Sequence, residues 1–206
     1  MPTHHYVCLN RLHRWQRYQI VEQLLDRQLD KFGKISYIEK PPTLVKYSHR
    51  LPLVLDSVKI DGSAMHTIDR NFIQGALFNI VTESAYELTD GHFTPGMTEK
   101  TFKAIALGQI PIFVAPFNTV ACYRNLGFDM FDDIIDHSYD QEPDPRLRII
   151  KIIDQVERIC QLSLDELVDL KKQLKSRFIN NLENLKSYDS YDHEFPQWRR
   201  IFSKFI

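Results

Sequence analysis

Short apolar runs alternate with longer stretches of helical periodicity over the first 128 residues of this 206-residue chain, and this alternation limits the possible folds most. Strand-length apolar runs separated by helices are typical of a parallel sheet, since parallel strands need long crossover connections. The expected strands are Tyr6–Leu9, Ile35–Ile38, Leu77–Val81 and Ile110–Ala115, with Leu51–Ile60 as a strand or an extended connection. The sequence therefore predicts an α/β fold with a Rossmann-like parallel sheet.

The helices of this region are indicated by periodicity and by residues that begin or end helices. Apolar side chains recur at helical spacing from His13 to Phe32, where Gly33 is expected to end the helix in the C′ position. Thr98 is a good N-cap for a helix over Glu99–Leu107 that ends before Gly108. A further short helix is expected from Asn118 to Leu126, and residues 129–140 are expected to be irregular or a short helix.

From Pro145 onward the pattern is helical. Asp144 and Pro145 fit the N-cap and N1 positions, and Ser163 with Glu166 forms a capping box that begins a helix over Leu164–Leu185. A last short helix is expected over Pro196–Phe205. We therefore predict a Rossmann-like unit over residues 1–145 and a C-terminal helical extension over 146–206 packed on it. The apolar face of its first helix is either core or a surface for a partner or oligomer; it comprises Ile149, Ile152, Ile153, Val156 and Ile159.

The composition excludes several classes of protein. A net charge of −1 with 43% hydrophobic residues is ordinary for a globular protein, and no apolar run reaches the ~20 residues needed to cross a bilayer. The first ten residues lack the pattern of a secretory signal. Three cysteines without a CxxC pair, Cys8, Cys122 and Cys160, favour reduced thiols and a cytoplasmic location. With seven glycines the chain contains neither glycine-rich phosphate loop.

The charge is unevenly distributed along the chain. Residues 1–60 carry a net charge of +5, residues 129–170 carry −8, and residues 171–206 carry +4. A basic N-terminal third suits an anionic ligand, whereas the basic C-terminal part is typical of solvated helix faces. In a parallel sheet, ligands bind at the carboxyl ends of the strands, which selects the loops 10–14, 82–100 and 115–119 as candidates.

The segment Thr98, Glu99 and Lys100 opens a helix directly after a long loop. A helix N-terminus presents unpaired N–H groups and partial positive charge, and Lys100 adds a full charge, so a phosphate is favoured there. Glu99 could accept hydrogen bonds from sugar hydroxyls. The alternative is that Glu99 simply complements the helix dipole and that Lys100 is solvated.

Polar residues also follow the first and third expected strands. Asn10 and Arg11 come directly after the first, and Arg14 and Arg17 lie three residues apart on one helical face, which suits bidentate binding of a pyrophosphate. The alternative is a basic, exposed face. Glu83 at the end of the third apolar run either binds a ligand hydroxyl or caps a neighbouring turn.

Metal and nucleophile chemistry have weaker candidates. The cluster Asp132, Asp133, Asp136, His137 and Asp140 lacks the spacing of a hard-cation loop, and we predict no metal site. His4 and His5 lie near the N-terminus. No serine nucleophile elbow is present, and no cysteine has a catalytic sequence context.

Four segments together resemble the donor-binding half of GT-B glycosyltransferases, most closely the α1,3-fucosyltransferase and exostosin type. They are VCLN (7–10), FNIVTES (78–84), MTEKTFKAIALGQIPIFV (97–114) and LGFDMFDDIIDHSYD (126–140). In that family a Glu ends one strand, T-E-K opens the next helix, and a glycine and a proline lead into the following strand. The chain is also similar to phage-borne glycosyltransferase-like proteins. The resemblance covers about residues 6–160.

The resemblance implies a single GT-B C-terminal-type domain that binds a nucleotide-diphosphate sugar and transfers the sugar to an acceptor that the sequence does not identify. Glu99 would hold ribose or sugar hydroxyls, and Lys100 the diphosphate. Asn10, Arg11, Arg14 and Arg17 would reach the phosphates, Glu83 would face the sugar or order the loop 85–97, and Thr98 belongs to the same T-E-K motif. No metal or other cofactor is implied.

Two departures from the family bear on catalysis. Gln16 stands where the relatives carry a His, and the acceptor domain of a GT-B enzyme is expected to be missing from this chain. No catalytic base is identified; His13, His92 and His137 are titratable groups in plausible loops. The alternative is a catalytically inactive nucleotide-sugar-binding or structural module. The acceptor could be a glycan, a protein, a lipid-linked sugar or a modified nucleic-acid base.

Overall fold

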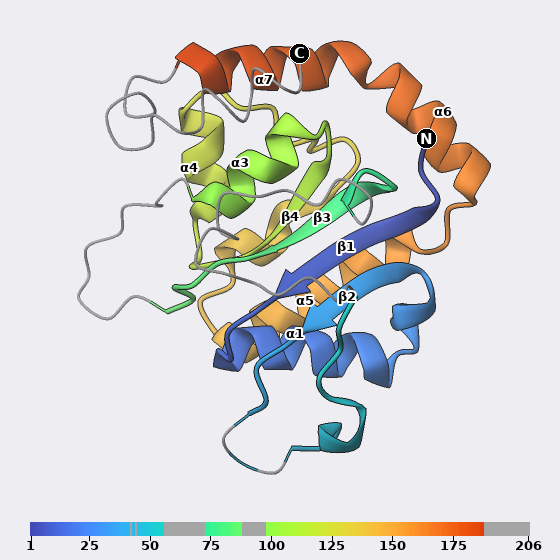
Figure 1. Ribbon diagram of the computed structural model, residues 1–206. Helices are drawn as coiled ribbons and strands as arrows, with labels where there is room; N and C mark the ends of the chain where they lie inside the picture. Colours follow the sequence, from blue (N-terminus) through green and yellow to red (C-terminus); the bar gives the residue numbers. More distant parts are fainter. Residues whose placement is uncertain (42, 44, 56–72, 88–97, 188–206) are drawn as a thin grey trace.

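Four parallel strands form one sheet, in the order β2-β1-β3-β4, in the computed structural model of the protein (Figure 1). The structure describes residues 1–41, 43, 45–55, 73–87 and 98–187. The strands are β1 (His4–Asn10), β2 (Gly33–Tyr37), β3 (Ala76–Thr82) and β4 (Ile110–Val114). They coincide with the four apolar runs predicted as strands, so the mixed α/β class with an all-parallel sheet is confirmed.

The fifth predicted strand or connection, Leu51–Ile60, is described only as far as residue 55. There Leu53 forms an isolated antiparallel bridge with Tyr37, the last residue of β2. This part of the chain is therefore an extended connection at the edge of the sheet rather than a fifth strand.

Helices cover both faces of the sheet. On one face α1 (Trp15–Asp26) packs against α5 (Pro145–Ile159), and on the other α3 (Glu99–Ala106) packs against α7 (Lys175–Ser187) (Figure 1). The described part of the chain also contains α4 (Thr119–Asn125), α6 (Leu164–Gln173) and three short 3-10 helices, η1 (Leu29–Lys31), η2 (Ser48–Arg50) and η4 (His137–Gln141). This layered arrangement is consistent with a Rossmann-like fold.

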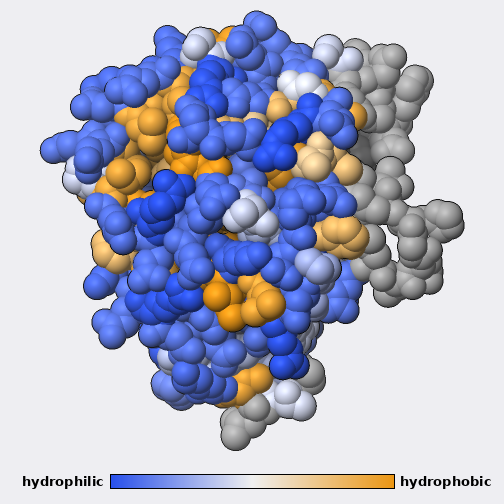
Figure 2. Space-filling model, turned by 180° about the vertical axis from the view of Figure 1, so that it is seen from behind, coloured by the Kyte–Doolittle hydropathy of each residue, from blue (hydrophilic) through white to orange (hydrophobic). Residues whose placement is uncertain are grey.

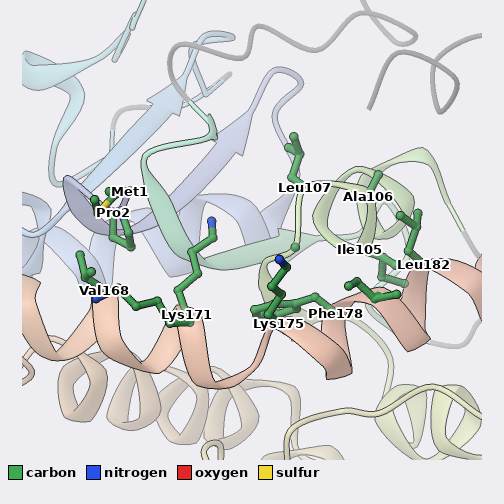
Figure 3. Close-up of a pocket in the computed structure, with 13 residues that line it drawn as sticks. Met1, Pro2, Ile105, Ala106, Leu107, Val168, Lys171, Lys175, Phe178 and Leu182 are labelled. Carbon is green, nitrogen blue, oxygen red and sulfur yellow. The ribbon is translucent and has the colours of Figure 1, made fainter. Parts of the chain in front are cut away.

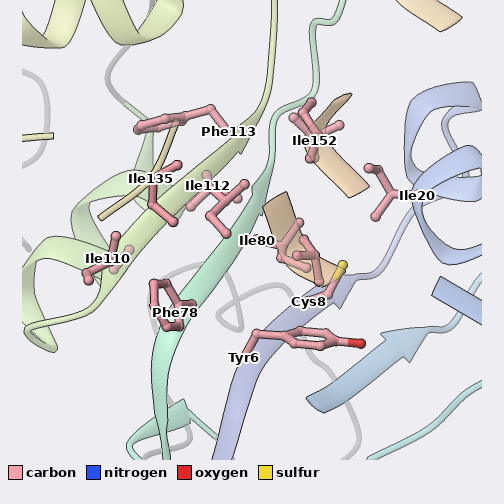
Figure 4. Close-up of a cluster of buried hydrophobic side chains, with 14 of the residues drawn as sticks. Tyr6, Cys8, Ile20, Phe78, Ile80, Ile110, Ile112, Phe113, Ile135 and Ile152 are labelled. Carbon is pink, nitrogen blue, oxygen red and sulfur yellow. The ribbon is translucent and has the colours of Figure 1, made fainter. Parts of the chain in front are cut away.

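The core is built on the apolar runs that predict the strands. Alternate residues of the strands point to the same face of the sheet as Ile20 of α1 and Ile152 of α5 (Figure 4). The strand residues of this group are Tyr6, Cys8, Phe78, Ile80, Ile110 and Ile112, each at most 1% exposed. The apolar face of α5 (Ile149, Ile152, Ile153, Val156 and Ile159) is buried in the same core, so of its two interpretations the core is confirmed.

The prediction of one continuous helix over His13–Phe32 is wrong for the second half of that range. α1 ends at Asp26, Gln28 adopts a left-handed conformation with φ of 55°, and η1 follows. Gly33 is not a C′ residue, because the glycines with positive φ in the described residues are Gly108 and Gly127. Gly33 instead begins β2 against Tyr6, where an added Cβ would lie 2.4 Å from the tyrosine ring. A close approach, rather than a helix end, requires the glycine.

The predicted helix ends are otherwise largely confirmed. The Thr98 hydroxyl accepts the Lys100 backbone N–H, Asp144 caps α5 ahead of Pro145, and Ser163 with Glu166 completes the capping box of α6. The helix predicted over Leu164–Leu185 is divided at the buried Leu174 into α6 and α7. The predicted helix Pro196–Phe205 lies outside the described residues.

The surface shown in Figure 2 is mostly hydrophilic, with hydrophobic residues gathered in smaller patches. Within the described residues, no helix combines the length and the apolar character that crossing a bilayer requires.

Candidate functional site

The candidate site follows from the strand order. β1 leads through α1 to β2 on one side, and the chain then returns to β3 on the other side of β1. The direction of winding therefore reverses between β1 and β3, which is where open α/β sheets form a ligand crevice at the carboxyl ends of their strands. Asn10 and Thr82, the last residues of these two strands, meet there through a 2.7 Å hydrogen bond from the Thr82 hydroxyl to Asn10 Oδ1.

Asn10 connects three strands rather than projecting into solvent. Its Nδ2 donates to the Ser36 carbonyl oxygen and to Cys8 Sγ, each at 3.3 Å, and its backbone N–H donates to the Ser36 hydroxyl. The side chain is 1% exposed. Burial raises the pKa of the neighbouring Cys8 thiol to about 12, so this cysteine remains a protonated core residue.

Gln16 and Arg17 fix the segment that follows β3 from the first turns of α1. Gln16 Nε2 donates to the carbonyl oxygens of Glu83, at 2.8 Å, and Ser84, at 3.2 Å. Arg17 is buried and donates to the carbonyl oxygens of Leu12 and Thr82. The structure thus brings the loops after β1 and β3 together, and the buried Arg17 side chain connects them through its hydrogen bonds.

Arg11 and Arg14 are exposed in the loop directly after β1. Arg14 is the N-cap residue of α1 and has an extended backbone. Neither guanidinium forms an ion pair within the described part of the chain. These two cations are therefore available to an anion at the crevice.

Glu83 lies at the junction between β3 and α3. Its backbone N–H continues the pairing with β4 through Val114, and its carboxylate is buried. Oε1 accepts the hydroxyl protons of Thr98, at 2.6 Å, and Thr101, at 3.2 Å, while Oε2 lies 3.7 Å from Lys100 Nζ. Of the two interpretations of Glu83, the structure favours the one in which it holds a neighbouring turn.

This arrangement brings the first turn of α3 to the carboxyl end of β3. Thr98 caps the helix, Lys100 is partly exposed, and Glu99 is the first helical residue, with its side chain outside the described part. The predicted site residues come from the carboxyl end of β1, the loops after β1 and β3, and the first turns of α1 and α3; they are Asn10, Arg11, Arg14, Arg17, Glu83, Thr98, Glu99 and Lys100. The backbone N–H groups of this first turn and the Lys100 ammonium favour an anion.

At the third candidate loop, 115–119, the protein's own side chain fills the position where an anion would bind. Asn118 precedes α4 but makes no side-chain cap. Asp140, which is 2% exposed, instead accepts the backbone N–H groups of Val120, at 2.9 Å, and Ala121, at 3.0 Å. Burial raises the pKa of this carboxyl, while the two N–H donors oppose the shift. Asp140 therefore occupies the helix N-terminus that an anion would need.

The other acidic residues near Asp140 form ion pairs. Asp132 pairs with Arg124, and Asp129 and Asp133 both accept hydrogen bonds from Arg177, which holds the pKa of each of these carboxyls below its ordinary value. Across the part of the chain that the structure describes, no group of three His, Cys, Asp or Glu residues has a geometry that could hold a metal ion.

His13 and His137 differ in their surroundings. His13 Nδ1 lies 2.5 Å from the Tyr37 hydroxyl, and its backbone N–H donates to Glu39. His137 is buried, with Nε2 at 2.8 Å from the Met130 carbonyl oxygen and Nδ1 at 2.9 Å from the Tyr139 hydroxyl. His92 lies outside the described residues.

We predict a pH effect on stability at His137. Burial lowers the pKa of His137, so the folded state binds fewer protons than the unfolded state just below the ordinary pKa of about 6.5. The free energy of unfolding should therefore fall as the pH is lowered through that value. Urea denaturation between about pH 8 and pH 5 measures the effect.

The His137→Gln variant should lose this part of the pH dependence, and the exposed His49→Gln variant should keep it. An unchanged pH profile in His137→Gln would contradict the assignment.

A second prediction concerns Glu83. Glu83→Ala leaves the Thr98 and Thr101 hydroxyls without their acceptor and should lower the free energy of unfolding by about 2 kcal/mol. Glu83→Gln keeps an acceptor oxygen and should lose less than half of that amount. Equal stability of Glu83→Ala and the parent in urea would show that the carboxylate does not hold α3.

Comparisons with protein-family models, with curated proteins and with solved structures find no match to this chain.

Sequence reasoning missed three residues that build the site or its surroundings. They are Gln16, whose Nε2 donates to the Glu83 and Ser84 carbonyl oxygens, Thr101, whose hydroxyl donates to Glu83, and Asp140, which accepts the N–H groups of Val120 and Ala121. Of these, Thr101 had a visible signal, because it follows Thr98 by three residues and thus lies on the same side of the helix.

Proposed function

We propose that this chain binds a nucleoside-diphosphate sugar at the crevice between the carboxyl ends of β1 and β3 and acts as a glycosyltransferase of the GT-B type. The observation that supports this proposal most strongly is the contact of Glu83 with Thr98, Thr101 and Lys100. This contact holds the N-terminus of α3 and the Lys100 side chain at the crevice between β1 and β3. The resemblance in the sequence supports the same residues.

The residues divide into two groups by exposure. Lys100 and the first N–H groups of α3 can bind one phosphate, and the exposed Arg11 and Arg14 can bind the other. Asn10, Arg17 and Glu83 are buried and bonded within the protein, which favours a positioning role for them. For Glu99 we propose the role that the resemblance implies, which is to accept hydrogen bonds from the hydroxyls of the ribose or the sugar.

In the transfer reaction the bond from the anomeric carbon to a phosphate oxygen breaks, and a bond to the acceptor oxygen forms. The diphosphate leaves with its negative charge increased. The cations and the helix N-terminus stabilise that charge, which is the electrostatic part of catalysis. The acceptor hydroxyl gives up its proton to a general base as the new bond forms.

A second candidate function is binding of the nucleotide sugar without turnover. The observation that favours it is the contact of the buried Glu83 carboxylate with Thr98, Thr101 and Lys100, because a carboxylate stabilised by two hydroxyl donors and a cation is a poor general base. Both functions use the same crevice and differ in whether the sugar is transferred.

Thermal unfolding with a panel of nucleoside diphosphates and their sugar conjugates tests the proposal. A ligand at about 100 times its dissociation constant should stabilise the fold by about 2.7 kcal/mol. The shift should fall by about half or more in Lys100→Ala and be kept in Lys34→Ala, which removes the same charge from an exposed position in β2. No stabilisation by any member of the panel would contradict both candidate functions.

Release of free nucleoside diphosphate from the sugar conjugate that binds separates the two functions. Release, by hydrolysis or by transfer to an added glycan, supports the glycosyltransferase. Binding without release supports the second candidate.

A further inference from the structure

An exposed aromatic side chain lies where the loop after β1 enters α1. Trp15 is the first residue of α1 and follows Arg14 directly, and it is 38% exposed. Leu12, in the same loop, is 49% exposed. The exposed Arg11 and Arg14 alternate with these two apolar residues along the chain. This short segment therefore combines apolar surface with cations beside the crevice.

The indole of Trp15 packs against Tyr86, in the segment that follows β3. The two ring centroids lie 5.8 Å apart, and the ring planes are inclined by 46°. Tyr86 is buried, at 4% exposed, whereas part of the indole faces solvent. Gln16, the next residue, donates to the Glu83 and Ser84 carbonyl oxygens and so holds the start of α1 against the same segment. Trp15 thus lies between the loops that form the crevice.

Tyr86 is held in place from α5. Its hydroxyl donates to the Pro145 carbonyl oxygen at 2.8 Å, and the guanidinium carbon of Arg148 lies 4.4 Å from its ring centroid. Arg148 also donates to the Tyr86 carbonyl oxygen at 3.3 Å and is 2% exposed. A side chain that is already fixed loses little further freedom when a ligand binds beside it. The indole of Trp15 therefore rests on a rigid support, which favours binding at its exposed part.

A hexopyranose ring has the chemistry that suits this surface. One side of the ring carries C–H groups that can pack on an indole, and the hydroxyls at its edge accept hydrogen bonds from guanidinium groups. In a nucleoside-diphosphate sugar this ring is attached directly to a phosphate, whereas the nucleobase is separated from the phosphates by the ribose. Arg14 is proposed to bind a phosphate and is adjacent to Trp15 in the chain. The ring attached to that phosphate is therefore the part of the donor closest to Trp15.

We propose that Trp15 binds the hexose ring of the donor through the exposed part of its indole, with Tyr86 as the support of the indole. The inference rests on the proposed function, because it takes the diphosphate to lie between Arg14 and Lys100. It adds that the sugar itself contributes to affinity, and that it is a pyranose with an open C–H face.

Calorimetric titration of the full-length chain with two probes tests the inference. The probes are the nucleoside diphosphate that stabilises the chain most in the thermal panel and the hexose conjugate of the same nucleotide. Trp15→Ala should weaken binding of the conjugate about fivefold or more and change binding of the free diphosphate less than about twofold. Trp15→Phe keeps a flat ring and should lose less. Lys100→Ala should weaken both probes by the same factor.

Two variants are matched controls. Phe117→Ala removes an aromatic side chain that is equally exposed, at 36%, from the loop between β4 and α4. Ile179→Ala removes an apolar side chain that is 44% exposed, from a groove of about 430 Å³ between the end of α3 and α7 (Figure 3). That groove is lined by Met1 and Pro2, which precede β1, so it lies at the opposite end of the sheet. Neither control should change the affinity for either probe.

Fluorescence gives a second measurement of the same contact. The sequence contains two tryptophans, Trp15 and Trp198, so Trp198→Phe leaves Trp15 as the only one. In this background the hexose conjugate should lower the acrylamide quenching constant roughly twofold, because the sugar covers the indole. The free diphosphate should leave the quenching constant unchanged. Circular dichroism confirms that each variant is folded.

Two results would overturn the inference and leave the proposed function in place. If Trp15→Ala binds both probes as the parent does, the indole does not touch the donor. If it weakens both probes equally and both lower the quenching, the indole stacks on the nucleobase instead. A different result, in which the parent chain binds neither probe, would overturn the proposed function and this inference with it.

Discussion

Replacing Arg14 and Lys100 together with alanine is expected to weaken the binding of the nucleoside diphosphate roughly a hundredfold or more. Each side chain would lose one hydrogen bond between charged groups, worth about 1.5–3 kcal/mol, and each 1.4 kcal/mol is a factor of ten in affinity. Arg14 is exposed, and Glu83 keeps its hydrogen bonds from Thr98 and Thr101 when Lys100 is replaced, so the fold should lose little stability. Isothermal titration calorimetry measures the change.

The matched control removes the same two charges from the other end of the sheet. Lys34 lies at the start of β2, and Arg50 pairs with Asp30 in η1, just before that strand. Lys34→Ala with Arg50→Ala should change the affinity less than about threefold, as expected for a long-range effect screened by salt. Equal losses in the two double variants would mean that net charge, and not the crevice, determines binding.

Replacing Asp140 with alanine is expected to destabilise the fold by about 2–5 kcal/mol. The substitution leaves the N–H groups of Val120 and Ala121 without their acceptor, and an unsatisfied buried donor costs about 1–3 kcal/mol. α4 begins at these donors and contains Tyr123, whose ring stacks on Phe113 of β4. The loss should therefore extend to the edge of the sheet. Equilibrium urea unfolding measures it.

Asp136→Ala is the control for this substitution. Asp136 also caps a helix, but it accepts the backbone N–H of Ser138 at an exposed site. We expect a loss of no more than about 1 kcal/mol there. A loss in Asp140→Ala as small as that in Asp136→Ala would show that the buried cap is not required for α4.

β1, β3 and β4 could be predicted because they are mostly apolar, which is what burial on both faces of a parallel sheet requires. β2 (GKISY) is an edge strand, and its apolar pattern is shorter. The helix caps at Thr98, Asp144 and Ser163 could be predicted because their partners lie within three residues. The break after Asp26 could not, since the periodic apolar pattern continues through it. There the positive φ of Gln28 and the contact of Gly33 with Tyr6 determine the chain direction.

The location of the candidate site could be predicted from the sequence. Which of its residues are exposed to a ligand and which are bonded within the protein could not. The strand order and the T-E-K segment select the loops after β1 and β3. The sequence does not reveal that Asn10 bonds to Thr82 or that Arg17 bonds to the Thr82 carbonyl oxygen, because these pairs are distant along the chain. For the same reason the sequence does not predict that Asp140 accepts the N–H groups at the start of α4.

Amide hydrogen exchange with and without a saturating nucleoside diphosphate tests the central claim most directly, because it locates the ligand in the unmodified protein. The account predicts slower exchange in two segments, residues 11–14 after β1 and residues 99–102 at the start of α3. The start of α4, where Asp140 already accepts the N–H groups, should not change. Protection confined to other segments, or none at all, would contradict a diphosphate site between β1 and β3.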